Sequence, residues 1–189
     1  GPIRLNSSIT SNALRTRLSV RAGSQAKLMD RRYSVLGRLV KLAETLTYAQ
    51  YPSIASKTDY VAAMTSEFAY VLAAEEIGKI EVPKRAQYLR VITAELQRIA
   101  SHLLWLGTWC MDMGGALGGG ATIFLYCIRE REDILDLFES LVGARLLYGF
   151  FQVGGVRYDI PDGWAAQCRA TIARIDQRLG EYEQMLEQN

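Results

Sequence analysis

Apolar residues recur every three or four positions over most of the chain, which is the spacing of one face of an α-helix. The clearest case is the segment 82–110, whose apolar residues are Leu89, Ile92, Leu96, Ile99, Leu103, Leu106 and Cys110. Pro83 suits the first turn of a helix, because the amide hydrogen that proline lacks would be unpaired there anyway. The pattern predicts one long helix that packs on its neighbours along a single stripe.

Other segments show the same periodicity. Further long helices are predicted over residues 58–77, 121–151 and 164–188, and a shorter amphipathic helix over residues 27–46. Alternating strand patterns are weak: the best covers residues 17–23, and residues 154–161 hold at most a brief extended segment. The fold class predicted is therefore mainly α.

We expect a bundle of four to five long helices with one core over residues 27–189. It is preceded by a basic N-terminal segment, residues 1–26, with arginine, serine and threonine but no acidic residue. This segment is interpreted as a small extended or β arm, with a transit segment as the alternative.

Composition narrows the possible functions. The chain is 49% hydrophobic and 22% charged with a net charge of +2, which does not indicate a nucleic-acid partner. No apolar run reaches the roughly 18 residues that a membrane helix needs, so a membrane role would be peripheral. Three scattered cysteines and one histidine argue against a metal site formed by this chain alone, and they favour reduced thiols in a reducing compartment.

The glycine-rich stretch 111–120 reads MDMGGALGGG and resembles a phosphate-binding loop only in composition. A phosphate loop would end in Lys-Ser or Lys-Thr, and a dinucleotide fingerprint would follow a strand, whereas this stretch follows a predicted helix. Two alternatives remain. The glycines provide positive φ angles in a turn between helices, or they let a ligand or a neighbouring chain approach the backbone closely. In the second case Asp112 is a polar group on an apolar wall.

Other polar and aromatic residues have ordinary explanations when each is taken alone. His102 lies beside the apolar stripe and is expected to be structural and hydrogen-bonded. The charge run 129–133 is typical of a solvated helix face. Trp105 and Trp109 share one helix face, in the core or at a partner interface. Tyr60 stands at a helix start, where a tyrosine usually packs with its hydroxyl at the edge.

Four sequence segments, taken together and in this order, point to a protein family more specifically than any one of them does alone. They include DYVAAMTSEFAYVLAAEE, HLLWLGT, REREDILDLFESLVGAR and GGVRYDIPDGW, and together they run from residue 47 to the end of the chain. The combination strongly resembles the quinone-site D subunit of respiratory complex I, the proton-pumping NADH:quinone oxidoreductase. The family is itself similar to the large subunit of membrane-bound [NiFe] hydrogenases.

The resemblance implies a peripheral-arm subunit that forms part of a site and is not a complete enzyme by itself. Its expected partners are an iron–sulfur subunit with the terminal [4Fe-4S] cluster, other peripheral-arm subunits and a membrane subunit. Quinone is the expected substrate, and no cofactor is expected on this chain alone. The implied location is the membrane periphery, on the cytoplasmic face of a bacterial inner membrane or on the mitochondrial matrix side.

The resemblance also suggests functional residues. Tyr60, in the sequence DY, matches the tyrosine that binds the quinone headgroup, and Asp112 matches the aspartate that follows the HLLWLGT helix. Arg38 matches an arginine near the partner's cluster if one residue is deleted. The chemistry is suitable, because a tyrosine hydroxyl can donate a proton to a reduced quinone and an acid in a low-dielectric cavity can change its protonation state.

Several family features are absent. No histidine of the N-terminal HP loop is present, Leu146–Leu147 replace the last two residues of GARMH, and Gln152 replaces the arginine of RPGG. The cysteine pairs that hold nickel and iron in the hydrogenases are missing, as is the C-terminal half of the family protein. Two hypotheses follow. We favour a divergent subunit that still contributes Tyr60 and Asp112 to a quinone cavity, and the alternative is a scaffold that binds neighbouring subunits without handling quinone.

Overall fold

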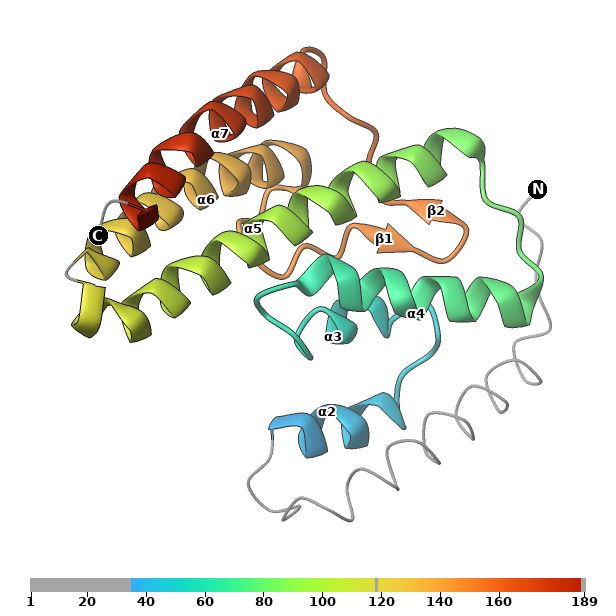
Figure 1. Ribbon diagram of the computed structural model, residues 1–189. Helices are drawn as coiled ribbons and strands as arrows, with labels where there is room; N and C mark the ends of the chain where they lie inside the picture. Colours follow the sequence, from blue (N-terminus) through green and yellow to red (C-terminus); the bar gives the residue numbers. More distant parts are fainter. Residues whose placement is uncertain (1–34, 118, 188–189) are drawn as a thin grey trace. The chain divides into compact units, whose positions relative to one another are not determined.

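The computed structural model describes residues 35–117 and 119–187, and within these ranges the chain is mostly helical (Figure 1). The helices are α2 (Val35–Ala43), α3 (Pro52–Ala55), α4 (Ala63–Gly78), α5 (Lys84–Leu117), α6 (Gly120–Val142) and α7 (Trp164–Glu187). Strands β1 (Phe151–Gln152) and β2 (Gly155–Val156) form an antiparallel hairpin in which Phe151 pairs with Val156. The predicted mainly α fold is confirmed, and β2 is the brief extended segment expected within residues 154–161.

The basic N-terminal arm expected over residues 1–26, with its candidate strand 17–23, lies outside the described residues. The same is true of the first part of the helix predicted over residues 27–46. The described remainder of that segment contains α2.

Two predicted helix boundaries are wrong, each for a local reason. The helix predicted from residue 58 begins at Ala63, because the preceding residues form a turn closed by the side chain of Asp59. The helix predicted to reach residue 151 ends at Val142, because Gly143 adopts a φ of 74° and its N–H donates to the Glu139 carbonyl at 2.8 Å. A left-handed glycine in this position is a common helix C-terminus.

Helix α5 is longer than predicted. It was expected to end at residue 110, at the glycine-rich stretch, yet it continues to Leu117 over 34 residues. Glycine is a poor helix former, so propensity alone would end the helix earlier. Tertiary packing contributes most of the stability of helices in proteins, and here it overrides the local preference.

The buried stripe of α5 is narrower than its sequence pattern suggests. Every second apolar position of the stripe is buried, at a spacing of seven residues: Leu89, Leu96, Leu103 and Cys110. The intervening Ile92 is 41% exposed, and polar Thr93 and Gln97 are fully buried on the adjacent face. The helix therefore presents a mixed apolar and polar buried surface.

The chain forms two compact units. Among the described residues, the first unit contains residues 35–90 and the segment 149–157. In it, α3 and β1 both pack on α4, and the core includes Met64, Val71, Phe150 and Phe151. The single domain expected over residues 27–189 stays a prediction.

The second unit contains residues 91–148 and the segment that begins at Tyr158. Helix α6 packs along α7, with Ile134, Phe138 and Ile175 buried. The indole N–H of Trp164 donates to the Leu137 carbonyl at 3.0 Å. This bond fixes the start of α7 on α6.

Candidate functional site

Tyr60 lies on the short loop between α3 and α4 in the first unit. Its side chain is 73% exposed, and its hydroxyl makes no hydrogen bond within the described part of the chain. Asp59 Oδ1 accepts the N–H groups of Val61 at 3.1 Å and Ala62 at 3.2 Å, which closes the loop around Tyr60. The packed position that is usual for a tyrosine at a helix start is therefore not found, and the hydroxyl is accessible to a ligand.

Helix α4, which follows this loop, carries a buried carboxylate. Glu67 Oε1 accepts the N–H of Gly149 at 2.8 Å, and Oε2 accepts those of Phe150 at 3.0 Å and Phe151 at 3.3 Å. Burial raises the pKa of Glu67 to about 7, and the three backbone N–H groups lower it only in part. Glu67 thus fixes the chain as it enters β1.

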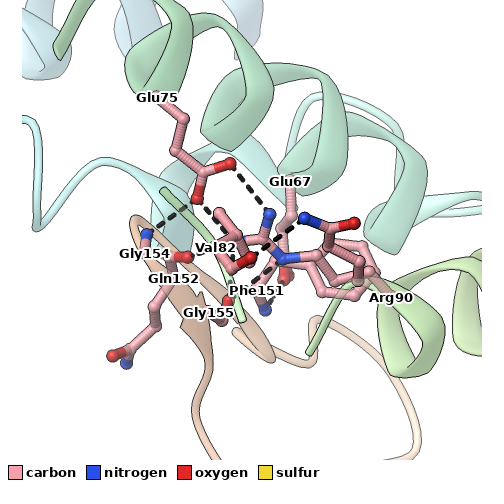
Figure 2. A network of polar contacts seen from close by, with 9 residues as sticks. Glu67, Glu75, Val82, Arg90, Phe151, Gln152, Gly154 and Gly155 are labelled. Atoms are coloured by element: carbon pink, nitrogen blue, oxygen red, sulfur yellow. Dashed lines mark hydrogen bonds and ion pairs between the residues drawn. The ribbon is translucent and has the colours of Figure 1, made fainter. Parts of the chain in front are cut away.

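A second glutamate of α4 fixes the turn of the hairpin (Figure 2). Glu75 and Arg90 form a two-bond ion pair, with Nη2–Oε1 at 2.6 Å and Nη1–Oε2 at 2.8 Å, and both side chains are buried. Glu75 also accepts the N–H of Gly154 at 2.7 Å, while Arg90 donates to the carbonyls of Gln152 and Gly155. The buried charges are paired and hydrogen-bonded, as their desolvation requires.

Sequence reasoning missed these three charged residues, although a signal was present. Glu67 and Glu75 are eight positions apart, which places both on one face of a helix, and that face is otherwise apolar. An acidic residue on an apolar face predicts a buried partner. The partners could not be named in advance, because most of them are backbone N–H groups of a distant loop.

Asp112 lies within α5, in the second unit, and not on a loop after the helix as expected. It is exposed, and so are its neighbours Met111 and Met113. An apolar groove next to this helix end is lined by Trp109, Cys110, Met113, Gly119, Gly120, Ile123, Met185 and Leu186. Tyr60 and Asp112 belong to different units, and a cavity shared by them stays a prediction.

The glycines around Asp112 are required by packing and not by backbone angles. A Cβ on Gly120 would lie 2.1 Å from the Cys110 carbonyl oxygen, and one on Gly114 would lie 2.7 Å from the Gly120 Cα. The described glycines of the stretch, Gly114, Gly119 and Gly120, have no positive φ angle, so the turn explanation is wrong for them. The glycines do allow a close approach to the backbone of α5, but the approaching segment is α6 of the same chain.

The other sequence candidates lie on the surface or in ion pairs. His102 is exposed, with no hydrogen bond of its ring among the described residues, and Arg38 is exposed on α2. Trp105 and Trp109 stack with ring centroids 6.3 Å apart and are 62% and 42% exposed, which excludes the core alternative. The charge run 129–133 was predicted to form a solvated helix face, and this prediction is wrong at one position.

That position is Glu130, which is fully buried in the second unit. It accepts hydrogen bonds from Arg129 at 2.6 Å and from the Tyr182 hydroxyl at 3.0 Å, and it also pairs with Arg178. The arginines lower the pKa of the Glu130 carboxyl against the effect of its burial. The acid therefore joins α6 to α7.

Two findings over the described ranges concern metals and membranes. No group of three or more His, Cys, Asp or Glu side chains there is arranged to hold a metal ion. None of the described helices is both long enough and apolar enough to cross a membrane.

Comparison with known proteins gives consistent matches. Residues 118–189 match the family described as respiratory-chain NADH dehydrogenase, 49 kDa subunit. The D subunit of the NADH-quinone oxidoreductase of Desulforamulus reducens is 42% identical over 149 residues, which are 79% of this chain and 39% of that protein. The H subunit of the chloroplastic NAD(P)H-quinone oxidoreductase of Daucus carota is 45% identical, over 79% of this chain and 37% of that protein.

A solved structure agrees with these sequence matches. A chain of the membrane-bound sulfane sulfur reductase, an archaeal respiratory membrane complex, superposes with a TM-score of 0.71 at 30% identity. The match covers 76% of this chain and 38% of that chain. This chain thus spans about two fifths of the length of the curated relatives it matches.

Proposed function

Because the chain is 42% and 45% identical to D- and H-type subunits of two such oxidoreductases over 149 residues, we propose that it is a D-type subunit of an NADH-quinone oxidoreductase and contributes to the quinone-reduction cavity of the complex. The complex would be a proton-translocating NADH:quinone oxidoreductase, with this chain in its peripheral arm. The single observation that carries the proposal is the accessibility of the Tyr60 hydroxyl on a closed loop.

Quinone reduction needs protons where the electrons arrive. A quinone takes up two electrons and two protons to form the quinol. In this proposal, Tyr60 donates a hydrogen bond to a quinone carbonyl oxygen and delivers one of the two protons as the electrons arrive. The second proton, and the proton that restores the Tyr60 hydroxyl, would come from water. A [4Fe-4S] cluster of a partner iron–sulfur subunit would supply the two electrons.

Asp112 has the second role in the proposal. It is an exposed acid in an otherwise apolar setting of methionine and tryptophan side chains. Once a partner covers this surface, the Asp112 carboxyl would serve as a proton-exchanging group beside the bound quinone. Arg38 is proposed to face the partner's cluster from α2, where its guanidinium is exposed.

The proposed partners follow from the same similarity. They are the cluster-bearing subunit, other peripheral-arm subunits and a membrane subunit. The complex would place this chain at the membrane periphery, on the cytoplasmic face of a bacterial inner membrane or on the matrix side of the mitochondrial one.

The test is Tyr60→Phe in the assembled complex. Loss of the hydroxyl should slow quinone reduction at least tenfold, because a positioned acid contributes on the order of a hundredfold or more. Tyr88→Phe is the matched control, since Tyr88 is a tyrosine of the same unit and is 71% exposed. Its turnover should be unchanged. Equal turnover in both variants would contradict the quinone proposal.

The second candidate function is a scaffold that binds neighbouring subunits without handling quinone. It is favoured by the exposed, stacked Trp105 and Trp109, because exposed aromatic pairs are typical of protein interfaces. It is also favoured by Leu147, which replaces the family histidine of GARMH and is 40% exposed. The scaffold alternative predicts that Trp105→Ser prevents assembly while Tyr60→Phe leaves turnover intact.

A further inference from the structure

The loop that carries Tyr60 is shaped by one neighbouring side chain. Asp59 Oδ1 accepts two backbone N–H groups, from Val61 at 3.1 Å and from Ala62 at 3.2 Å. Tyr60 is the residue enclosed between the acceptor and its first donor. Such a side-chain turn fixes the backbone angles of the enclosed residue and hence the direction of its side chain.

The neighbouring residues on either side of the loop have other roles. Ala62 is the N-cap of α4 and has no side chain that could cap the helix. On the other side of the loop, Thr58 Oγ1 donates backwards to the Ala55 carbonyl at 2.7 Å and so closes the end of α3. Tyr60 itself is held by no hydrogen bond of its hydroxyl in the described ranges, so its orientation depends on its backbone.

We infer that Asp59 is a positioning residue for Tyr60, which it orients toward the bound quinone through the Asp59 side-chain turn. This inference rests on the proposed function. Without the turn, Tyr60 would sample several directions, and only a fraction of the molecules would present the hydroxyl productively. The apparent affinity for the substrate falls by that fraction, while molecules that have bound substrate react as before.

The experiment uses the assembled complex and a short-chain benzoquinone as substrate. Asp59→Ala should raise the KM for the quinone about fivefold to tenfold and leave kcat within about twofold. Asp59→Asn keeps the accepting Oδ1 atom without the charge and should retain the normal KM. Asp59→Glu keeps the charge on a longer side chain and should behave like Asp59→Ala.

The opposite result, with Glu retaining the normal KM and Asn not, would overturn the inference in favour of a direct effect of the charge. If Asp59→Ala fails to assemble, the Asn and Glu variants decide the question by themselves. Normal KM values in both of them would also overturn it.

A double variant tests whether Asp59 acts through Tyr60. In a Tyr60→Phe background, Asp59→Ala should change KM by less than about twofold, because the group it orients is already missing. A full fivefold rise in that background would show that Asp59 acts elsewhere. If the proposed function itself is wrong, the result is distinguishable: Tyr60→Phe alone would leave turnover unchanged, independently of the KM values of the Asp59 variants.

Discussion

Glu67 holds a carboxylate in the interior of the first unit, and its partners in the described ranges are three backbone N–H groups. A lysine or arginine partner would have favoured the charged form strongly. Backbone groups favour it less, so burial dominates and the pKa of Glu67 rises to about 7.

This shift predicts how stability depends on pH. The folded chain binds the Glu67 proton more tightly than the unfolded chain, whose carboxyl has an ordinary pKa of about 4.5. The contribution of this group to the free energy of unfolding is therefore complete below about pH 4.5, and it falls by about 3 kcal/mol as pH rises to about 7.

The measurement is denaturant unfolding of the wild type and Glu67→Gln from pH 4.5 to 7.5. The stability of the wild type relative to the Gln variant should decrease as pH rises. A constant difference over that range would contradict the assignment.

Individual functional residues were only partly predictable. The sequence resemblance identified Tyr60 and Asp112 as candidates, but it could not show that Tyr60 is exposed or that Asp112 lies within a helix. Both properties depend on local hydrogen bonds and helix packing that no residue-type pattern encodes. Glu130 shows the same limit, because a charged run appears solvated until a second helix supplies Arg178 and Tyr182.

Among the elements, α5 and α6 approach each other most closely at their glycines. A Cβ atom on Gly120 would lie 2.1 Å from the carbonyl oxygen of Cys110. The backbone of α5 or of α6 would therefore have to move to accept any side chain at this position. Gly107 meets α6 in the same way, with the Phe124 side chain 3.0 Å from its ideal Cβ position. Small residues thus determine how near these helices lie.

Gly120→Ala should lower the free energy of unfolding by about 3 kcal/mol or more, since overpacking against backbone has no flexible side chain to absorb it. Gly180→Ala is the control: Gly180 lies within α7, and nothing surrounds its Cβ position. There, alanine should raise stability by about 0.5–1 kcal/mol through helix propensity. Thermal or denaturant unfolding of both variants checks this. A stable Gly120→Ala variant would mean that the two helices are farther apart than described.

The long helices were predictable because their apolar periodicity is strong and uninterrupted. Their ends were not, since glycine has opposite effects at different positions. Gly143 ends α6 by adopting a positive φ, whereas Gly114 lies inside α5 because another backbone needs its space. The hairpin could not be predicted either, because its two-residue strands are held by Glu67 and Glu75 rather than by a strand pattern.

For the molecule as a whole, Arg90 joins parts of the chain that are far apart in sequence. Its guanidinium binds Glu75 and the hairpin carbonyls of Gln152 and Gly155 at once. Arg90→Ala should lower the free energy of unfolding by about 3–5 kcal/mol, because it leaves Glu75 buried without its countercharge.

Arg98→Ala provides the comparison in the same helix. Arg98 pairs with Glu95 on the exposed surface, so its loss should leave stability nearly unchanged. Equal effects of the two variants in urea unfolding would show that the Arg90 pair is not buried in solution.

The class of the whole molecule was more predictable than its organisation. Ordered motifs were enough to identify the family, because they extend over most of the chain. The division into two units was not visible, since no linker composition marks it. The first unit combines residues 35–90 with the distant segment 149–157, and only three-dimensional contacts reveal such an arrangement.

This discontinuous arrangement determines the order in which the chain can fold during synthesis. Helix α4 leaves the ribosome long before the loop whose N–H groups Glu67 accepts, which lies 82–84 residues later. Until that loop is made, Glu67 and Glu75 have no hairpin to bind and are better solvated by water than buried. Residues 91–148 of the second unit, which include most of α5 and all of α6, are synthesised in the interval, whereas α7 follows the loop. The first unit therefore cannot reach its native packing until residues 149–157 have been made, although its helices α2 to α4 are synthesised first.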